Sequence, residues 1–339
     1  MKSPIPVTLI TGFLGAGKTT LVQHLLENST GRRFAIIENE FGDVGIDGTL
    51  VSRGEDAVFE LNDGCVCCTV REDLVEVFEQ IDAGEETFDH VLIETTGLAE
   101  PGPVMSIFDR PALRQAFTLD GVICVVDAGH LEQSLDEVSA CAEQVAYADL
   151  LILNKVDGRT ALGLDETEAR LRRLNPLAEI VRAEHARVDV ESVLALVRRP
   201  AEESVGTPHD HGHGHDHNHH HHHHHDEDHH EHDDDIGAVV VEAAGDVHVD
   251  ALDLWLGKLA RGHDPVLLRM KGILAVPGHA RRFVFNGVRT VVDVRPDRAW
   301  GTDARYSRVV LIGKSLDAET LQAGFASCMV DAHASANVP

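Results

Sequence analysis

The sequence has few basic residues, few aromatic residues and no long apolar run. Its 29 Lys and Arg stand against 57 Asp and Glu, which gives a formal net charge of −28. Nonspecific binding to nucleic acid or to an anionic membrane requires a basic surface, so we expect neither partner. No apolar stretch approaches the ~18 residues that a membrane-spanning helix needs. With 43% hydrophobic residues, the chain can still form cores of substantial size.

Cysteine is also scarce, and it is unevenly distributed. Six cysteines in 339 residues are too few for a disulfide framework. Three of them fall within residues 65–68, which indicates metal or redox chemistry in a reducing compartment. The apolar N-terminal stretch shows no secretory cleavage pattern, so we expect a cytoplasmic protein. Cys124 and Cys141 lie in a strand and a helix pattern and Cys328 lies near the C-terminus, and all three are expected to be packing residues.

Strand and helix patterns alternate through the first 200 residues. The expected strands are 7–11, 33–39, 58–61, 90–94, 121–127, 150–154 and 179–182. The expected helices are 19–27, 72–81, 135–147, 166–174 and 192–198. This alternation predicts an α/β domain over residues 1–200, with a mainly parallel sheet covered by helices on both faces. Such sheets bind ligands at the carboxyl ends of their strands.

The composition changes abruptly over residues 201–236. Residues 201–235 hold eleven Asp and Glu with no Lys or Arg, and 15 of the 23 histidines lie between His209 and His232. A segment with almost no apolar residues cannot offset its ordering entropy, so we expect a disordered linker. Neutral imidazoles bind Zn²⁺, Ni²⁺, Co²⁺ and Cu²⁺. The linker is therefore either a spacer or a weak metal reservoir, with ligands His209, His211, His213, His215 and His217.

A second, smaller domain is expected over residues 237–330. The expected strands are 237–243, 266–276, 282–294 and 308–312, and the expected helices are 250–261 and 317–325. This pattern predicts an α+β domain of about 100 residues. Trp300 and Phe283 are expected to belong to its core.

A P-loop follows the first expected strand. Gly12 is followed after four residues by Gly17-Lys18-Thr19, between a strand and a helix, as the motif requires. Backbone N–H groups and the helix N-terminus are expected to hold phosphates, with Lys18 on the β- and γ-phosphates and Thr19 on Mg²⁺. The residues expected to bind nucleotide here are Gly12, Gly15, Ala16, Gly17, Lys18, Thr19 and Thr20.

Two further motifs indicate GTP rather than ATP. Asn154, Lys155 and Asp157 form an N-K-x-D sequence at the end of an expected strand, where the carboxylate accepts hydrogen bonds from guanine N1–H and the 2-amino group. Adenine lacks that donor pair, so the site discriminates against it. The strand 90–94 ends in Glu94, a Walker-B acid placed to hold Mg²⁺. Gly97 then matches the glycine whose N–H senses the γ-phosphate.

The Walker-B segment departs from common GTPases in two ways. Its acid is Glu instead of Asp, and Leu98 stands where many signalling GTPases carry a glutamine that orients the hydrolytic water. From the P-loop and the Walker-B motif, the expected catalytic residues are Lys18, Thr19 and Glu94. We expect slow intrinsic hydrolysis, below about 1 s⁻¹, that a metal or a partner stimulates.

The three clustered cysteines suit a soft metal ion. Cys65, Cys67 and Cys68 can converge on one cation at about 2.3 Å, and Zn²⁺, Co²⁺ or Cu⁺ fits such thiolates whereas Mg²⁺ does not. Only three ligands are evident, and an incompletely closed site is what a protein that releases its metal needs. A disulfide switch and inert buried cysteines are the alternatives.

Together these motifs resemble the CobW family of P-loop GTPases. The resemblance rests on GFLGAGKTT, IIENEFG at 36–42, GCVCC, ETTGLAEP at 94–101 and NKVD, and extends through the C-terminal region. It covers nearly the whole chain except the histidine linker, and is strongest to YjiA-type members. It implies a metallochaperone that passes zinc from the CxCC motif to client metalloproteins with GTP hydrolysis. By this resemblance, Glu38 is implicated in metal binding or switching.

Several other functions stay open at this point. A cobalt-handling accessory GTPase of cobalamin biosynthesis would show the same motifs, because thiolate sites accept both metals. A passive histidine-rich metal store would show no nucleotide-dependent metal affinity, and a P-loop kinase would prefer ATP. Homo-oligomerisation is compatible with all of these functions.

Overall fold

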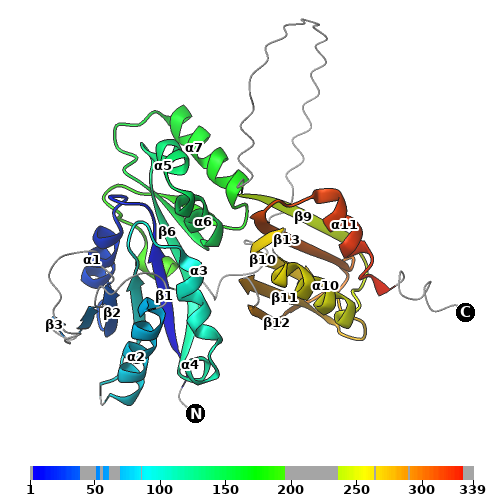
Figure 1. The fold of residues 1–339 in the computed structure, drawn as a ribbon, viewed down its shortest axis with the longest axis horizontal. Helices are drawn as coiled ribbons and strands as arrows, with labels where there is room; N and C mark the ends of the chain where they lie inside the picture. Colours follow the sequence, from blue (N-terminus) through cyan, green and yellow to red (C-terminus); the bar gives the residue numbers. More distant parts are fainter. Residues whose placement is uncertain are drawn as a thin grey trace, which may run out of the picture.

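The computed structural model describes residues 3–38, 51–53, 56–60, 69–84, 86–194, 236–262, 265–288 and 291–330. Within these ranges the chain forms two sheets, each with its own helices, which lie side by side (Figure 1). No helix in the described ranges is long and apolar enough to cross a membrane.

The first sheet has eight strands in the order β3-β4-β2-β5-β1-β6-β7-β8. Its strands are β1 (Ile5–Thr11), β2 (Phe34–Glu38), β3 (Val51–Arg53), β4 (Asp56–Glu60), β5 (His90–Glu94), β6 (Phe117–Asp127), β7 (Leu150–Asn154) and β8 (Glu179–Arg182). All neighbouring strands are parallel except β3, which pairs antiparallel with β4 at one edge. The predicted mainly parallel sheet is confirmed.

Helices cover both faces of this sheet, as predicted. They are α1 (Lys18–Asn28), α2 (Thr69–Ala83), α3 (Pro101–Met105), the 3₁₀ turn η1 (Ser106–Asp109), α4 (Pro111–Ala116), α5 (Leu131–Glu137), α6 (Ser139–Tyr147), α7 (Ala161–Leu174) and α8 (Val190–Val193). One core packs α1 and α8 against the alternate residues of the central strands, for example Ile10 and Ile36. The opposite residues, for example Leu9 and Ile37, pack under α2 and α3. The side chains therefore alternate between two buried faces.

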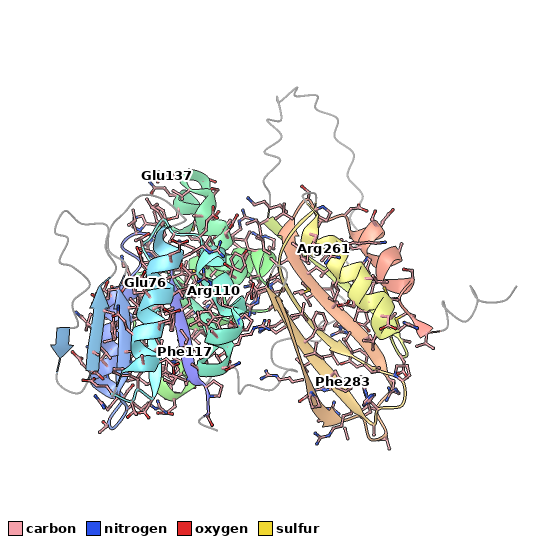
Figure 2. The ribbon with its side chains drawn as sticks, turned by 60° about the horizontal axis from the view of Figure 1, so that its bottom comes forward. Glu76, Arg110, Phe117, Glu137, Arg261 and Phe283 are labelled. Atoms are coloured by element: carbon pink, nitrogen blue, oxygen red, sulfur yellow. The ribbon has the colours of Figure 1, made fainter. Side chains whose placement is uncertain are left out.

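The second sheet is antiparallel, with five strands in the order β12-β11-β10-β13-β9. Its elements are β9 (Ile236–Ala244), α10 (Val249–Arg261), β10 (Val266–Leu274), β11 (Arg281–Val288), β12 (Val291–Ala299), β13 (Tyr306–Lys314) and α11 (Ala318–Ala326). Figure 2 shows α10, with Arg261 at its end, over the sheet that carries Phe283. Phe283 packs against the core under α10 and α11, and Trp300 is buried. The predicted α+β domain is confirmed.

The two domains share an apolar contact. The buried cluster beneath α2 and α3 continues into side chains of the second sheet, among them Leu268 and Val310. Figure 1 shows α6 on the side of the first domain that is nearest to β10 and β13. The second domain is therefore packed against the first in this structure.

Some predicted boundaries were wrong. The helix predicted over 135–147 is two helices, because the β-branched Val138 adopts an extended conformation (φ −141°) between α5 and α6. The strand predicted over 282–294 is in fact two antiparallel strands, β11 and β12, because the alternating pattern continues through both of them. The helix predicted over 192–198 begins earlier, at Val190, after the cap Asp189, and residues 195–198 lie outside the described ranges.

Three short elements between β5 and β6 were not predicted from the sequence. Pro101 begins α3 and Pro111 begins α4, each at the first helical position, where proline loses no hydrogen bond. Glu100 is the N-cap residue of α3. Pro101 therefore marks the start of a helix directly after the Walker-B loop.

Candidate nucleotide-binding site

The P-loop turns between β1 and α1 through glycines with positive φ. Gly12, Gly15 and Gly17 have φ values of 136°, 72° and 112°, a region that side-chain-bearing residues rarely adopt. A Cβ atom on Gly12 would also lie 2.2 Å from the carbonyl oxygen of Val125 on β6. Backbone geometry and lack of space therefore both require glycine at position 12.

Lys18 is folded over the loop that precedes it. Its Nζ donates hydrogen bonds to the carbonyl oxygens of Gly12, at 2.9 Å, and Phe13, at 3.3 Å. The residue is only 8% exposed, and burial lowers the pKa of its ammonium group although the carboxylate of Glu94 acts in the opposite direction. The ammonium is thus held at the loop, and its hydrogen-bond partners among the described residues are backbone oxygens, which a phosphate can replace.

Thr19 and Glu94 meet across the mouth of the loop. The Thr19 hydroxyl donates a hydrogen bond of 2.7 Å to Oε1 of Glu94, which is the last residue of β5. Hydroxyl and carboxylate oxygens are the hard ligands that Mg²⁺ prefers. The two residues predicted to hold Mg²⁺, 75 positions apart in sequence, are therefore brought together.

Gly97 lies against the P-loop. The loop after β5 is attached to β1 by the hydrogen bond from Thr95 N–H to the carbonyl of Ile10, 3.0 Å long. A Cβ on Gly97 would lie 2.6 Å from the backbone nitrogen of Leu14. The predicted γ-phosphate sensor is thus next to the phosphate-binding loop, and its contact has no room for a side chain.

Asn154, predicted to bind the nucleotide, connects two loops of the site. It is 2% exposed; its Nδ2 donates to the carbonyl of Ala16 at 2.9 Å, and its Oδ1 accepts from the N–H of Ala186 at 2.8 Å. A Cβ on Gly17 would lie 2.5 Å from Asn154 Nδ2. The side chain therefore fixes the P-loop relative to the loop after β8.

Lys155 lies at the exposed rim of the site with φ 59°. Its Nζ donates a 2.8 Å hydrogen bond to Asp127 at the end of β6. Partial burial acts to raise the pKa of Asp127, but hydrogen bonds from Lys155, the Gly129 N–H and His130 outweigh it and hold that pKa below its ordinary value. Asp157 lies two residues further on and is exposed.

The remaining residues predicted to bind nucleotide lie in the P-loop or in the first turn of α1. Gly15 is exposed, Ala16 is 1% exposed, and Thr20 is exposed in the first turn of α1. Asp127 was not predicted as a site residue, although it ends a strand in the same way as Glu94, which was. Nor was the buried Gln144 of α6, whose Nε2 donates to the carbonyls of Gly97 at 3.1 Å and Ala99 at 3.0 Å.

Of the predicted zinc-site residues, only Glu38 lies within the described ranges. Glu38 ends β2 and pairs in register with Glu94 on β5 and with Glu60 on β4. Cys65, Cys67 and Cys68 lie outside the described residues, as do the linker histidines His209, His211, His213, His215 and His217. Within the described ranges, no group of three His, Cys, Asp or Glu residues is placed to hold a metal ion.

A pocket of about 350 Å³ adjoins the P-loop. Phe13, Leu14 and Gly15 form one wall, and the end of β6 with α5 and α6 forms the others. Cys124 and Cys141 line it but are buried, and burial raises the pKa of each thiol, that of Cys141 to about 11. With Cys328, which is also buried, they are the packing residues that the sequence predicted.

Two family profiles match this chain. The profile described as CobW/HypB/UreG, nucleotide-binding domain, matches residues 6–182. The profile described as Cobalamin synthesis protein cobW C-terminal domain matches residues 236–329.

Relatives with similar sequences match the chain over nearly its full length. The zinc chaperone YjiA of Escherichia coli is 33% identical over 329 residues, which are 96% of this chain and 98% of the relative. The zinc chaperone CobW of Pseudomonas aeruginosa is 40% identical over 348 aligned positions, 92% of this chain and 88% of the relative. The crystal structure of Zn(II)-bound YjiA GTPase from E. coli has a TM-score of 0.72 at 31% identity, covering 96% of this chain and 99% of that one.

Proposed function

The chain belongs to the CobW/HypB/UreG family, and we propose that it is a GTP-hydrolysing metallochaperone that binds zinc at Cys65, Cys67 and Cys68 and transfers it to client metalloproteins. Two sequence relatives that cover most of the chain are named zinc chaperones, which supports zinc as the cargo. We assign the P-loop domain to residues 1–200, the linker to 201–236 and the CobW-type domain to 237–330.

The nucleotide roles follow from the geometry of the P-loop. The backbone N–H groups of Gly15 to Thr19 and the start of α1 would surround the phosphates, and Lys18 would exchange its two carbonyl partners for phosphate oxygens. Thr19 and Glu94 provide the oxygen ligands that fit Mg²⁺. When bound, Mg²⁺ neutralises charge that develops on the phosphates.

We assign guanine binding to the N-K-x-D residues at the end of β7. Asp157 would accept the hydrogen bonds of guanine N1–H and the 2-amino group, because its exposed carboxylate stands at the rim of this site. Lys155, restrained by Asp127, would lie along the base, and Asn154 would hold the loops in place. A base without the donor pair would leave this carboxylate unsatisfied, which favours GTP over ATP.

The register of Glu38 and Glu94 is the observation that carries the metallochaperone proposal. The two acids are Cα partners at the ends of the adjacent parallel strands β2 and β5. Neighbouring strands lie ≈ 4.8 Å apart, and register partners point to the same face of the sheet. The acid assigned to zinc and the acid assigned to Mg²⁺ are therefore neighbours, so a change in phosphate occupancy would act directly beside the zinc ligands.

The strand that precedes the cysteines in the sequence pairs with the strand that carries Glu38. Cys65, Cys67 and Cys68 lie in the sequence between β4 and α2, and β4 ends at Glu60, the other register partner of Glu38. We infer that GTP favours the zinc-loaded state and that hydrolysis releases zinc or the client. Inverting a 99:1 preference requires about 5.5 kcal/mol of differential binding, and zinc must then change nucleotide affinity by the same factor.

A competitive zinc titration tests this proposal. The full chain is titrated against a chromophoric chelator in the presence of a nonhydrolysable GTP analogue, of GDP and of no nucleotide. We expect zinc affinity to differ at least about tenfold between the analogue and GDP forms, and Cys67→Ala to abolish the difference. Cys328→Ala is the matched control, because Cys328 is buried in the other domain and should leave the titration unchanged. Equal zinc affinities in all three wild-type states would refute the metallochaperone function.

The histidine linker is proposed as a separate, weak metal reservoir. Deleting residues 209–232 should lower the number of metal ions bound per chain but leave GTP hydrolysis and the thiol site intact. Loss of GTP hydrolysis in the deletion variant would show that the linker is part of the enzyme.

A further inference from the structure

Helix α6 contacts the loop that carries Gly97. Gln144 is fully buried on this helix, and its Nε2 donates to the carbonyl oxygens of Gly97 and Ala99 at 3.1 and 3.0 Å. A side-chain amide has two donor hydrogens, so both are used on this loop. Because Gly97 itself lies against Leu14 of the P-loop, the position of Gln144 determines how the loop approaches the phosphate site.

The same helix and the residues after it contact the second domain. Glu143, next to Gln144, forms an ion pair of 3.3 Å with Lys314 of β13. Just beyond α6, Asp149 accepts a 2.9 Å hydrogen bond from Lys271 of β10. Arg269 of β10 donates to Asp149 and to the carbonyl oxygen of Tyr147, the last residue of α6. Both strands thus hold the end of this helix.

Arg269, Lys271 and Asp149 form an ion cluster between the two domains, and this cluster is largely buried. Arg269 is 1% exposed, and the side chains of Lys271 and Asp149 are 13% and 15% exposed. Burial acts to raise the pKa of Asp149, but the charges of Arg269 and Lys271 hold it well below its ordinary value. A buried charge that loses its partner is strongly unfavourable. Any movement of α6 must therefore carry the second sheet with it or break these contacts.

The contact between Gln144 and the loop leaves one buried polar atom unpaired within the described part of the chain. Oε1 of Gln144 is buried and has no hydrogen-bond partner among the described residues. Leaving a buried acceptor unpaired is unfavourable, so a rearrangement that gave Oε1 a hydrogen-bond donor would stabilise this contact. Gln144 also lines the pocket of about 350 Å³ beside the P-loop, which provides space for the side chain to reorient.

We propose that α6 couples the Gly97–Ala99 loop to the C-terminal sheet, so that the nucleotide in the P-loop and the docking of the C-terminal domain each shift the other's equilibrium. Gln144 is the positioning residue on the nucleotide side, and Arg269 is its counterpart on the domain side. The proposal rests on the proposed binding of GTP and adds to it a structural route between the two domains. By reciprocity, weakening the docking must change the relative affinities for GTP and GDP.

A double-mutant cycle tests this coupling. For the full chain, the affinities for a nonhydrolysable GTP analogue and for GDP are measured with fluorescent nucleotides, and their ratio is compared between variants. We expect Gln144→Met and Arg269→Met each to change the ratio at least about fivefold, a typical coupling factor. The double variant should change this affinity ratio by no more than the larger of the two single effects. Either substitution alone already breaks the chain of contacts through α6, so the second one has nothing further to interrupt.

Arg282→Met is the matched control. Arg282 is equally buried in the same domain, but its Nε donates at 2.5 Å to Asp297 of the adjoining strand β12. Losing it should lower the domain's stability without changing the nucleotide ratio. If Arg269→Met does not fold, Lys314→Met interrupts the partly exposed contact to Glu143 instead and should change the ratio in the same direction.

The outcomes separate this proposal from the proposed function. An unchanged ratio in Arg269→Met or Lys314→Met, additive effects in the double variant, or an equal change in Arg282→Met would each overturn the coupling while GTP binding stands. Failure of the wild-type chain to bind guanine nucleotides would instead overturn the function itself.

Discussion

The imidazole of His90 shares a hydrogen bond of 2.8 Å with the hydroxyl of Thr8 inside the parallel sheet. His90 begins β5 and is 3% exposed, and its ring packs 6.0 Å from that of Phe34. Burial, with a contribution from the charge of Arg32, lowers the pKa of His90 from 6.5 to about 4. The folded protein therefore holds this histidine in its neutral form.

This shift predicts a loss of stability at mildly acid pH. Protonation favours the unfolded chain, whose histidine pKa is the higher one, so the stabilisation present at pH 7 declines as the pH falls from about 6.5 towards 4. Between pH 7 and 4.5 the expected contribution is about 2 kcal/mol. Urea unfolding of the wild type and of His90→Gln at both pH values measures it. The variant should lose about 2 kcal/mol less than the wild type over this interval, and identical pH dependence would show that His90 is not responsible.

Glu94→Gln should impair hydrolysis more than nucleotide binding. The amide can still accept the hydrogen bond from Thr19, but it lacks the charge that attracts Mg²⁺. We expect kcat to fall by about 10–100-fold with Mg²⁺ affinity falling in parallel, as measured by phosphate release over a magnesium titration. Glu86→Gln, an exposed change at the surface ion pair with Arg33, should behave as the wild type. A Glu94 variant with full activity would remove this residue from the magnesium site.

Asp157→Ala should abolish the preference for guanine. Without the carboxylate, the N1–H and 2-amino donors of guanine lose their acceptor, whereas ATP loses nothing. The ratio of GTP to ATP affinity should fall at least about 10²-fold, as measured by competition against a fluorescent nucleotide. Asp136→Ala provides a control, because Asp136 lies on the exposed side of α5. If discrimination survived in Asp157→Ala, guanine would be recognised elsewhere.

Gly97→Ala should weaken GTP binding selectively. The added methyl group would lie 2.6 Å from the backbone nitrogen of Leu14, so the loop must move away from the P-loop. We expect the affinity for a GTP analogue to fall about tenfold or more, a free-energy change of about 1.4 kcal/mol, with little change for GDP. Gly237→Ala, where a Cβ meets nothing within 4 Å, is the matched substitution. Equal losses for both nucleotides would mean that Gly97 does not sense the terminal phosphate.

The sequence predicted those parts of the molecule that local chemistry determines. The P-loop, the Walker-B acid and the N-K-x-D corner each follow a buried apolar strand, so their motifs could be recognised and placed at one edge of the sheet. The resemblance to the CobW family, which implied a GTPase, is confirmed by the family profiles and the full-length relatives. The individual roles of these residues stay predictions.

The parts that the sequence did not predict depend on contacts between distant segments. Nothing in the local pattern distinguishes Gln144 from an ordinary helical glutamine, because its partners lie more than 40 residues away. Similarly, the sequence shows Arg269 and Lys271 only as polar residues of a strand. Their shared partner Asp149 becomes evident only from the packing of the two domains. The break at Val138 was missed because the apolar period continues across it.

The two hydrogen bonds of Asn154 constrain how this site can diversify. Because one buried amide holds both the phosphate loop and the loop that follows β8, a substitution at Asn154 will disturb the base-binding end and the phosphate-binding end of the site together. Descendants of this chain that replace Asn154 would therefore need compensating changes on both loops at once.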